Sequence, residues 1–188
     1  MDEGTSDPDN AGLKPTFHRS IPPMDDVERD VCSHCGYVAY QNPKIVAGSV
    51  ARASDGRILM CRRAIEPRRG FWTLPAGYLE LNESPEQGAL REAREEANAE
   101  LALGPLLGVY TVHRLSQVQL IFRATLLNEP RAGPESLEVA LFAPEDIPTD
   151  DLAFPTVHWA LQHDFAVESG AISGPSFNPA DGSTDLPE

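Results

Sequence analysis

One arginine and three glutamates stand close together near the middle of the chain: Arg91, Glu92, Glu95 and Glu96. On a helix with about 100° between residues, the three glutamates fall within about 100° of one another and share one stripe. Like charges at this spacing destabilise a helix by about a few tenths of a kcal/mol per pair. A bound Mg²⁺ or Mn²⁺ would reverse that cost, because both are hard ions that prefer carboxylate oxygens. A solvated acidic helix face is the alternative that this pattern leaves open.

The residues around the stripe predict the helix that positions it. Ser84 is a good N-cap, Pro85 suits the first helical position, and Gln87 completes a capping box. Asn98 tolerates the left-handed conformation that ends many helices. These signals predict a helix over residues 85–97. Its apolar stripe, suited to packing on a sheet, contains Leu90, Ala93 and Ala97.

The wider spacing is more specific than the helix alone. The residues Gly77, Glu83, Arg91, Glu92, Glu95 and Glu96 are arranged as Gly-x5-Glu-x7-Arg-Glu-x2-Glu-Glu. Six fixed residues at ordinary usage arise by chance about 10⁻⁸ to 10⁻⁷ times per starting position. The segment 77–99 resembles the signature of the Nudix hydrolases. Asn98 stands where that family usually has glycine, and its tolerance of the left-handed conformation preserves the turn.

This resemblance implies a fold, a reaction and a set of metal ligands. The fold would be a Nudix α/β/α sandwich with a mixed β-sheet, and the reaction the hydrolysis of a diphosphate that links a nucleoside to another group. Two or three Mg²⁺ or Mn²⁺ ions would be bound. Glu95, Glu96 and the Gly77 carbonyl would be direct ligands, and Glu92 a direct or water-mediated one. Arg91 would hold the glutamates by ion pairing, and Glu83 would brace the loop or reach a second metal.

The chemistry also requires a group that activates water. A diphosphate resists attack because its oxygens are anionic, so a catalyst must neutralise charge, position a water molecule and lower the pKa of that water. A carboxylate outside the helix would orient or deprotonate the nucleophile. Glu135 and Glu138, in the loop over residues 131–138, are the candidates. Ordinary loop acids are the alternative interpretation of both.

Further segments resemble the ADP-ribose and FAD pyrophosphatase branch of the family over about residues 17–165. They are Cys32–Gly36, Tyr40–Lys44, Trp72–Glu80, Gly133–Ser136 and Leu152–Phe154. The favoured substrates are therefore FAD, giving FMN and AMP, and ADP-ribose, giving ribose 5-phosphate and AMP. An NADH-type dinucleotide pyrophosphatase is one alternative, although Ser116–Gln119 does not supply the Ser-Gln-Pro-Trp-Trp stretch of those relatives. A non-catalytic nucleotide-sensing Nudix module is the other.

That branch carries a zinc ribbon with two Cys-x2-Cys knuckles ahead of the Nudix domain. This chain keeps one knuckle, Cys32 and Cys35, and has His18 near the position of the other. Structural zinc takes four ligands, usually cysteine and histidine. Cys32, Cys35 and His18 are thus an incomplete zinc site, and a metal-free relic is the favoured interpretation.

Four side chains near the signature are candidates for substrate binding. Arg62 and Arg68 could hold phosphate oxygens. Trp72 and Tyr78 could stack on adenine or isoalloxazine. A surface role for the arginines and a core role for the aromatic residues are the alternatives.

Charge and composition limit the partners of this 188-residue chain. It has 15 Lys and Arg against 29 Asp and Glu, a net charge of −14, and eight of the acids lie in residues 1–13 and 166–188, which have no base. An acidic balance argues against nucleic-acid and anionic-membrane binding. No run of about 18 apolar residues and no export signal is visible. Three cysteines are not a disulfide framework and favour a reducing, cytoplasmic location. We expect a small-molecule nucleotide substrate and a homodimer.

The remaining pattern predicts the order of elements. Apolar runs at 44–53 and 58–61 flank Asp55-Gly56, a hairpin signal. Further strands are predicted at 71–74, 106–113, 118–127 and 139–142, and a final helix at 154–165. The expected domains are an acidic disordered tail (1–16), a zinc-ribbon-like segment (17–43), the Nudix domain (44–165) and a disordered tail (166–188).

Overall fold

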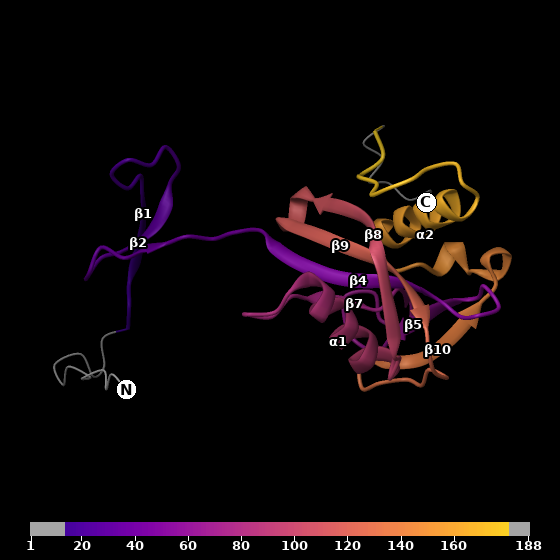
Figure 1. Cartoon of the computed structure of the whole chain (residues 1–188). Helices are drawn as coiled ribbons and strands as arrows, with labels where there is room; N and C mark the ends of the chain where they lie inside the picture. Colours follow the sequence, from indigo (N-terminus) through magenta and orange to yellow (C-terminus); the bar gives the residue numbers. More distant parts are fainter. Residues whose placement is uncertain (1–13, 181–188) are drawn as a thin grey trace, which may run out of the picture. The chain divides into compact units, whose positions relative to one another are not determined.

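The computed structural model describes residues 14–180 of the chain. The chain forms two compact units, Met1–Asn42 and Pro43–Glu188. The smaller unit contains a three-stranded antiparallel sheet with β2 in the centre (Figure 1). Its strands are β1 (Phe17–Ser20), β2 (Arg29–Cys32) and β3 (Val38–Ala39). Residues 1–13 of the predicted N-terminal tail lie outside the described residues.

The larger unit is built on one mixed sheet in the order β10-β5-β4-β9-β8, with β6 paired to β5 and β7 paired to β4 (Figure 1). Among the named strands of this sheet in residues 14–180, the central pair β4–β9 is parallel and the other pairs are antiparallel. The strands are β4 (Lys44–Arg52), β5 (Ile58–Arg63), β6 (Trp72–Thr73), β7 (Ala76–Tyr78), β8 (Leu101–Val112), β9 (Gln117–Leu126) and β10 (Ser136–Phe142). The mixed sheet expected from the sequence is confirmed.

Helix α1 (Pro85–Ala97) has the predicted bounds and the predicted ends. The Ser84 side chain accepts a hydrogen bond from the Gln87 backbone N–H, and the Gln87 side chain accepts one from the Ser84 backbone N–H. Asn98 ends the helix with a φ of 46°. The helix packs on the sheet face that carries Ala51, Leu59 and Cys61, through its alanines Ala93 and Ala97. Small residues on both sides bring the helix backbone close to β4.

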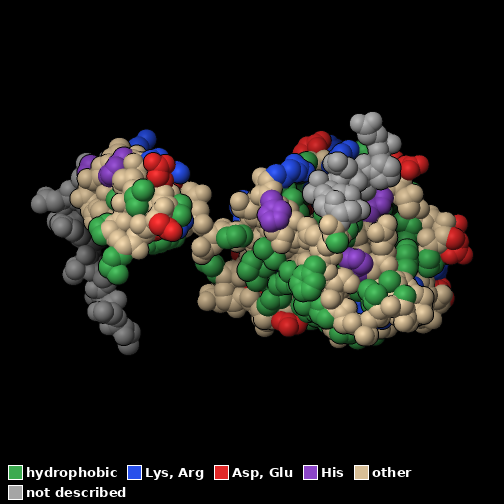
Figure 2. Space-filling view, turned by 90° about the horizontal axis from the view of Figure 1, so that it is seen from above, with side chains coloured by type: hydrophobic (Ala, Val, Ile, Leu, Met, Phe, Trp, Pro, Cys, Tyr) green, Lys and Arg blue, Asp and Glu red, His purple; other side chains and the backbone are tan. Residues whose placement is uncertain are grey.

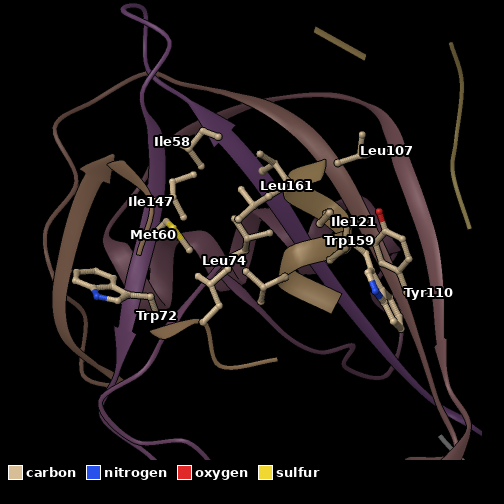
Figure 3. Close-up of a cluster of buried hydrophobic side chains, with 14 residues drawn as sticks. Ile58, Met60, Trp72, Leu74, Leu107, Tyr110, Ile121, Ile147, Trp159 and Leu161 are labelled. Atoms are coloured by element: carbon tan, nitrogen blue, oxygen red, sulfur yellow. The ribbon is translucent and has the colours of Figure 1, made fainter. Parts of the chain in front are cut away.

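Helix α2 (Pro155–Glu168) covers the opposite face of the sheet and completes the three-layer α/β/α arrangement. The core on this side contains alternate residues of the strands, among them Val50, Ile58 and Met60, packed against Trp159 and Leu161 of the helix (Figure 3). A buried carboxylate fastens the helix to the sheet. Asp164, which has no exposed surface, accepts hydrogen bonds from Arg52 of β4 and Arg123 of β9.

Residues 166–180 differ from the disordered tail expected over 166–188, and residues 181–188 lie outside the described residues. Helix α2 continues to Glu168, and residues 171–180, here called the C-terminal strap, run along the edge strand β8. Ser176 exchanges backbone hydrogen bonds with Leu107 and Val109, and the Asn178 amide pairs with both backbone groups of Thr111. The composition of the strap predicted disorder because these partners are about 70 residues away in sequence and leave no local pattern.

Strand β8 begins five residues earlier than predicted. Gly104 and Pro105 are unfavourable in a regular strand, because glycine weakens a strand and proline cannot donate to the ladder. The structure accommodates both at an irregularity, where the register with β9 shifts between Leu103 and Leu106. The turn-rich segment before residue 43 likewise contains three short strands that the sequence did not indicate.

On the face of the larger unit that Figure 2 shows, Lys, Arg, Asp and Glu side chains lie in small groups near the rim, and hydrophobic and other groups fill most of the middle. No helix within residues 14–180 has the length and apolar character needed to cross a lipid bilayer.

Candidate active site

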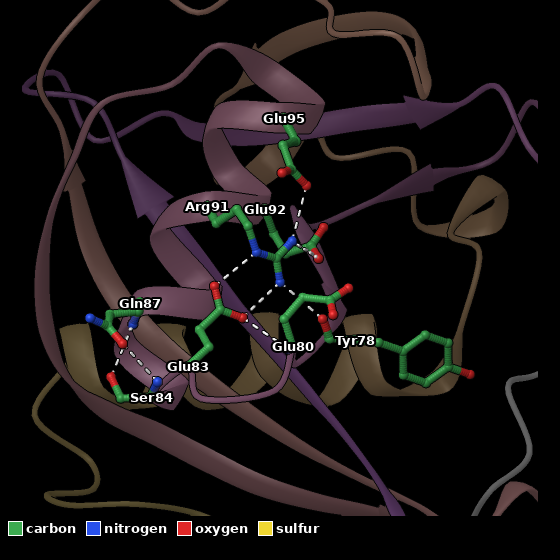
Figure 4. Close-up of polar contacts among 8 residues, drawn as sticks. All are labelled: Tyr78, Glu80, Glu83, Ser84, Gln87, Arg91, Glu92 and Glu95. Carbon is green, nitrogen blue, oxygen red and sulfur yellow. Dashed lines mark hydrogen bonds and ion pairs between the residues drawn. The ribbon is translucent and has the colours of Figure 1, made fainter. Parts of the chain in front are cut away.

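The Arg91 guanidinium is the centre of the glutamate stripe (Figure 4). It donates two hydrogen bonds to Glu83, from Nε at 2.8 Å and from Nη2 at 2.9 Å. Its Nη1 lies 2.6 Å from Glu92 Oε1 and 3.0 Å from Glu95 Oε2. Its Nη2 also donates to the Tyr78 backbone carbonyl at 2.9 Å. One side chain therefore ties the helix to the loop that precedes it and to strand β7.

These contacts affect the ionisation of the partners. The bidentate pair with Arg91 lowers the pKa of Glu83 to about 2. The same pair, supported by Glu92 and Glu95, raises the pKa of Arg91 above its usual value. Arg91 and Glu83 are thus a permanently charged pair at any physiological pH.

Glu92 and Glu96 are buried, whereas the side chain of Glu95 is 56% exposed. Burial raises the pKa of Glu92, although Arg91 opposes that effect. Burial also raises the pKa of Glu96, to about 8, against the lowering effect of a hydrogen bond from the Ala76 backbone N–H. A cation bound here would offset the cost of burying these carboxylates.

Strand β7 lies so close to the stripe that a side chain at Gly77 would displace the Glu92 carboxylate. A Cβ on Gly77 would lie 2.3 Å from Glu92 Oε1 and 2.4 Å from its Cδ. The next backbone group back along the strand, the Ala76 N–H, donates to Glu96 Oε2 at 3.1 Å. The Gly77 position predicted from the sequence therefore lies in direct contact with the glutamate stripe.

The donor set fits a hard divalent cation. Three carboxylates, those of Glu83, Glu92 and Glu95, surround the Arg91 guanidinium, and the buried Glu96 carboxylate is held separately by the Ala76 N–H, which leaves an excess of negative charge lined with oxygen atoms. Within residues 14–180, however, no three acidic, histidine or cysteine side chains converge on one point. The carboxylates turn toward Arg91 instead, so that binding an ion requires Glu92 and Glu95 to rotate.

The loop between β9 and β10 caps the end of α1. This α1-capping loop, residues 128–135, donates hydrogen bonds from Arg131 N to the Ala97 carbonyl at 2.8 Å and from Gly133 N to the Glu96 carbonyl at 2.9 Å. The Asn98 amide donates to the Arg131 carbonyl at 3.1 Å. A Cβ on Gly133 would lie within 2 Å of the Glu95 carbonyl oxygen, so the loop sits directly on the helix backbone.

The two candidate bases lie in different surroundings. Glu135 ends the α1-capping loop, and its carboxylate adds to the effect of burial in raising the pKa of both Glu92 and Glu96. Glu138 is exposed on β10, and its Oε2 lies 3.4 Å from Arg62 Nη1. The structure therefore brings Glu135, and not Glu138, toward the stripe.

The candidate substrate-binding side chains are dispersed. Arg62 donates to the Gly70 carbonyl and pairs with Glu138, and Arg68 lies over the Phe71 ring. Trp72 is only 8% exposed and packs edge-on against Phe142 at 4.9 Å, so it belongs to the core (Figure 3). The prediction of a stacking role for Trp72 is not compatible with this burial. The Tyr78 ring is 53% exposed and points away from Arg91 (Figure 4).

Arg63, the neighbour of Arg62 on β5, acts on the site through its positive charge. Burial raises the pKa of Glu96, and the positive charge of the Arg63 guanidinium acts in the opposite direction and lowers it. Arg63 Nε donates to the Pro67 carbonyl at 2.9 Å, and the guanidinium lies 5.1 Å from the Phe154 ring centre. The alternation of side chains along β5 indicates that Arg63 points toward the site, because Leu59, Cys61 and Arg63 share the face on which α1 packs.

The knuckle of the smaller unit does not gather zinc ligands. Cys32 is buried on β2, Cys35 is exposed in the following turn, and both are free thiols. His18 Nδ1 lies 3.1 Å from Ser33 Oγ. No group of three metal-binding side chains is found in the described part of the chain, so Cys32, Cys35 and His18 are not brought together as a zinc site.

Comparisons with known proteins agree with this geometry. The family model described as NUDIX domain matches residues 42–161. A Nudix hydrolase from Nitrosomonas europaea has a solved structure that is 40% identical, with a TM-score of 0.79 over 89% of this chain and 94% of that one.

Two curated relatives match over shorter regions. A MutT-like protein from Streptomyces ambofaciens is 40% identical over 54% of this chain and 64% of its own length, slightly under two thirds. An ADP-ribose pyrophosphatase from Methanocaldococcus jannaschii is 27% identical over 60% of this chain and 69% of its own length. Because the NUDIX model covers well over half of the chain and the solved relative covers nearly all of it, this protein belongs to the Nudix family.

Proposed function

We propose that the protein is a metal-dependent diphosphatase that hydrolyses nucleoside diphosphate-linked compounds, with ADP-ribose and FAD as the favoured substrates. The observation that carries the proposal is the stripe of Glu92, Glu95 and Glu96 beside β7, where Arg91 holds the first two and the Ala76 N–H holds the third. The similarity to an ADP-ribose pyrophosphatase supports the substrate class. FAD is favoured because several segments of the sequence resemble the FAD pyrophosphatase branch.

The residues proposed to hold two or three Mg²⁺ or Mn²⁺ ions are Glu92, Glu95, Glu96, the Gly77 carbonyl and Glu83. Bound there, the ions would neutralise diphosphate charge and lower the pKa of the attacking water. Glu92 and Glu95 would turn from Arg91 toward the ions, while Arg91 keeps the Glu83 carboxylate in a fixed orientation through two hydrogen bonds. The Ala76 N–H fixes the Glu96 carboxylate in the same way.

Glu135 is the proposed base. It is the acid outside α1 whose charge acts on both buried glutamates, and its backbone carbonyl is held by the Ala64 N–H at 2.8 Å. In this role its carboxylate would accept a proton from the water that attacks phosphorus. Glu138 is expected to contribute little, because its carboxylate pairs with Arg62 and is not among the charges that act on Glu92 and Glu96.

The test is a turnover screen of FAD, ADP-ribose, NADH and diadenosine polyphosphates with Mg²⁺ and with Mn²⁺. FAD should give FMN and AMP, ADP-ribose should give ribose 5-phosphate and AMP, and EDTA should abolish both reactions. Water labelled with ¹⁸O should leave its label on a product phosphate. Free adenine or nicotinamide as a product would refute the proposed bond cleavage, and preference for NADH would favour the dinucleotide alternative.

A matched pair of variants tests the residues. Glu96→Gln should lower turnover by several orders of magnitude while preserving the fold, because an amide is a poor ligand for a hard ion. Glu138→Gln should remain within a few-fold of the wild type, whereas Glu135→Gln should lose most of its rate. Near-normal turnover of Glu96→Gln at millimolar Mg²⁺ would refute the proposed centre, and tight nucleotide binding without turnover by the wild type would favour a sensing module.

We further expect a homodimer and a cytoplasmic location. The free state of Cys32, Cys35 and Cys61 supports a reducing compartment. Size-exclusion chromatography with light scattering tests the dimer.

A further inference from the structure

Polar side chains gather at one end of the sheet face that α2 covers. Gln117 and Gln119 stand two residues apart on β9 and therefore point to the same face. Their partners across the parallel pair are Lys44 and Val46 of β4, and Val46 pairs in turn with Tyr78 of β7. We name Lys44, Tyr78, Gln117 and Gln119 the amide patch.

Helix α2 leaves this end of the face open. It covers the neighbouring Tyr110, which pairs with Gln119, is fully buried and packs on Trp159. Beyond that point the Tyr78 ring is 53% exposed, Lys44 is exposed and Gln119 is half-buried. The amide patch is thus a polar, partly open continuation of a face that is otherwise apolar core.

The members of the patch are joined by hydrogen bonds. Gln119 Nε2 donates to Gln117 Oε1 at 2.8 Å, and Gln117 Nε2 donates to the Tyr78 hydroxyl at 3.5 Å. Gln117 is 8% exposed, so its orientation is fixed by its neighbours. Among the described residues, neither Gln119 Oε1 nor the Tyr78 O–H proton has a further partner. One acceptor and one donor therefore remain at the two ends of the chain of amides.

Tyr78 connects the patch to the glutamate stripe. Its backbone carbonyl accepts from Arg91 Nη2, while its ring points away from Arg91 toward the other face (Figure 4). The edge of β7 that does not pair with β4 carries the Ala76 N–H and the Tyr78 carbonyl, which contact Glu96 and Arg91, so the stripe and the patch share this strand. The Lys44 ammonium lies 5.2 Å from the centre of the Tyr78 ring and adds a positive charge beside it.

We infer that the amide patch is a subsite that reads the planar ring of the substrate. The Tyr78 ring stacks on it, and Gln117 and Gln119 hydrogen-bond to its edge. The ligand class is a heteroaromatic ring whose edge carries adjacent hydrogen-bond donors and acceptors. A nucleobase and the flavin ring share this chemistry. The inference rests on the proposed diphosphatase function and adds the residues that select the substrate.

The physical reason is the cost of a buried amide. A buried Gln117 would cost folding free energy unless its amide donors and acceptor were hydrogen-bonded. Its bonds with Gln119 and Tyr78 satisfy them and leave the polar edge of Gln119 toward solvent. Such a site favours the matching ring over other groups, because its polar groups stay unpaired when the wrong ring, or no ring, is bound. A purely aliphatic group in place of the ring gains nothing from these groups.

The experiment compares Gln117→Leu and Gln119→Leu with Gln162→Leu, a glutamine exposed on α2. KM and kcat are measured for ADP-ribose, FAD and a ring-free diphosphate diester of two ribose units. The two patch variants should raise KM for ADP-ribose or FAD about tenfold with kcat within twofold, and should leave the ring-free diester unchanged. The control should match the wild type for all three compounds.

A second readout does not depend on turnover. Binding of AMP and FMN to the full chain is followed by calorimetry and by flavin fluorescence. Weakened AMP binding in Gln119→Leu and in Tyr78→Leu identifies the nucleobase as the ring, and weakened FMN binding alone identifies the flavin. Unchanged binding of both nucleotides in correctly folded variants overturns the inference. Hydrolysis of no diphosphate by the wild type would instead refute the proposed function, and the binding measurement would still decide the patch.

Discussion

Gly133→Ala tests whether the α1-capping loop holds the active site together. The new Cβ would lie within 2 Å of the Glu95 carbonyl oxygen, 2.8 Å from its carbon and 3.1 Å from the Glu96 carbonyl carbon. All three are backbone atoms, so no side chain can turn away to make room. The loop must lift off the helix instead.

The cost can be worked from the contacts that would be lost. The hydrogen bond from Gly133 N to the Glu96 carbonyl contributes about 0.5–1.5 kcal/mol, and overpacking typically costs about 1–3 kcal/mol. We expect a loss of about 2 kcal/mol in the free energy of unfolding. For a unit of this size that corresponds to a decrease in Tm of about 4–8 °C.

Activity should fall more than stability. Lifting the loop moves Glu135, which ends it, away from Glu92 and Glu96. A shift of about 1 Å in a reacting group can cost about a hundredfold in rate, so kcat should fall by about that factor with little change in KM.

The assay combines urea unfolding and scanning calorimetry with steady-state kinetics. Ala132→Ser, which adds one atom at the exposed neighbouring position, is the control. A Gly133→Ala variant with a Tm within 1 °C of the wild type and normal kcat would show that the loop is not seated on the helix as described.

Three further predictions concern other parts of the fold. Asp164→Ala should lower the free energy of unfolding by about 3 kcal/mol, because it leaves Arg52 and Arg123 without their buried partner; urea unfolding measures this, and Asp151→Ala at an exposed position is the control. Burial lowers the pKa of His163, whose Nδ1 lies 2.8 Å from the Tyr110 hydroxyl. Its contribution is therefore present above the unfolded pKa of about 6.5 and is lost as pH falls below that value. The wild type should lose more stability than His163→Gln between pH 7.5 and 5.5, and equal losses would contradict the assignment. Cys32→Ser should leave the diphosphatase rate within twofold of the wild type, and elemental analysis should find less than one zinc per chain; one tightly bound zinc, with unfolding on chelation, would disprove this.

The elements that could be predicted from the sequence are those specified by local chemistry. Helix α1 was predicted to the residue because Ser84, Gln87 and Asn98 act within a few positions of its ends. The spacing of the glutamates also predicted their common face. It did not predict that Arg91 would contact Glu83, Glu92 and Glu95 at once, because this depends on how the loop before the helix folds back.

Long-range contacts account for most of what the sequence did not reveal. The sequence around Trp72 is compatible both with a ring that faces a ligand and with a ring in the core. The packing of Phe142, distant in sequence, against Trp72 places the ring in the core. Glu135 and Glu138 were equivalent in sequence, but the close approach at Gly133 brings one of them to the stripe. The C-terminal strap was missed for the same reason, since its pairing with β8 is made across the sheet.

The strap has a consequence for the colloidal behaviour of the protein. Strand β8 is the last strand of the sheet, and a bare edge strand is a template for pairing with another chain. Ser176 and Asn178 occupy backbone groups of Leu107, Val109 and Thr111 that would otherwise face solvent. Removing residues after 170 would therefore expose a self-complementary edge on an intact domain, and such a truncated protein would form strand-to-strand aggregates while its catalytic face remained unchanged.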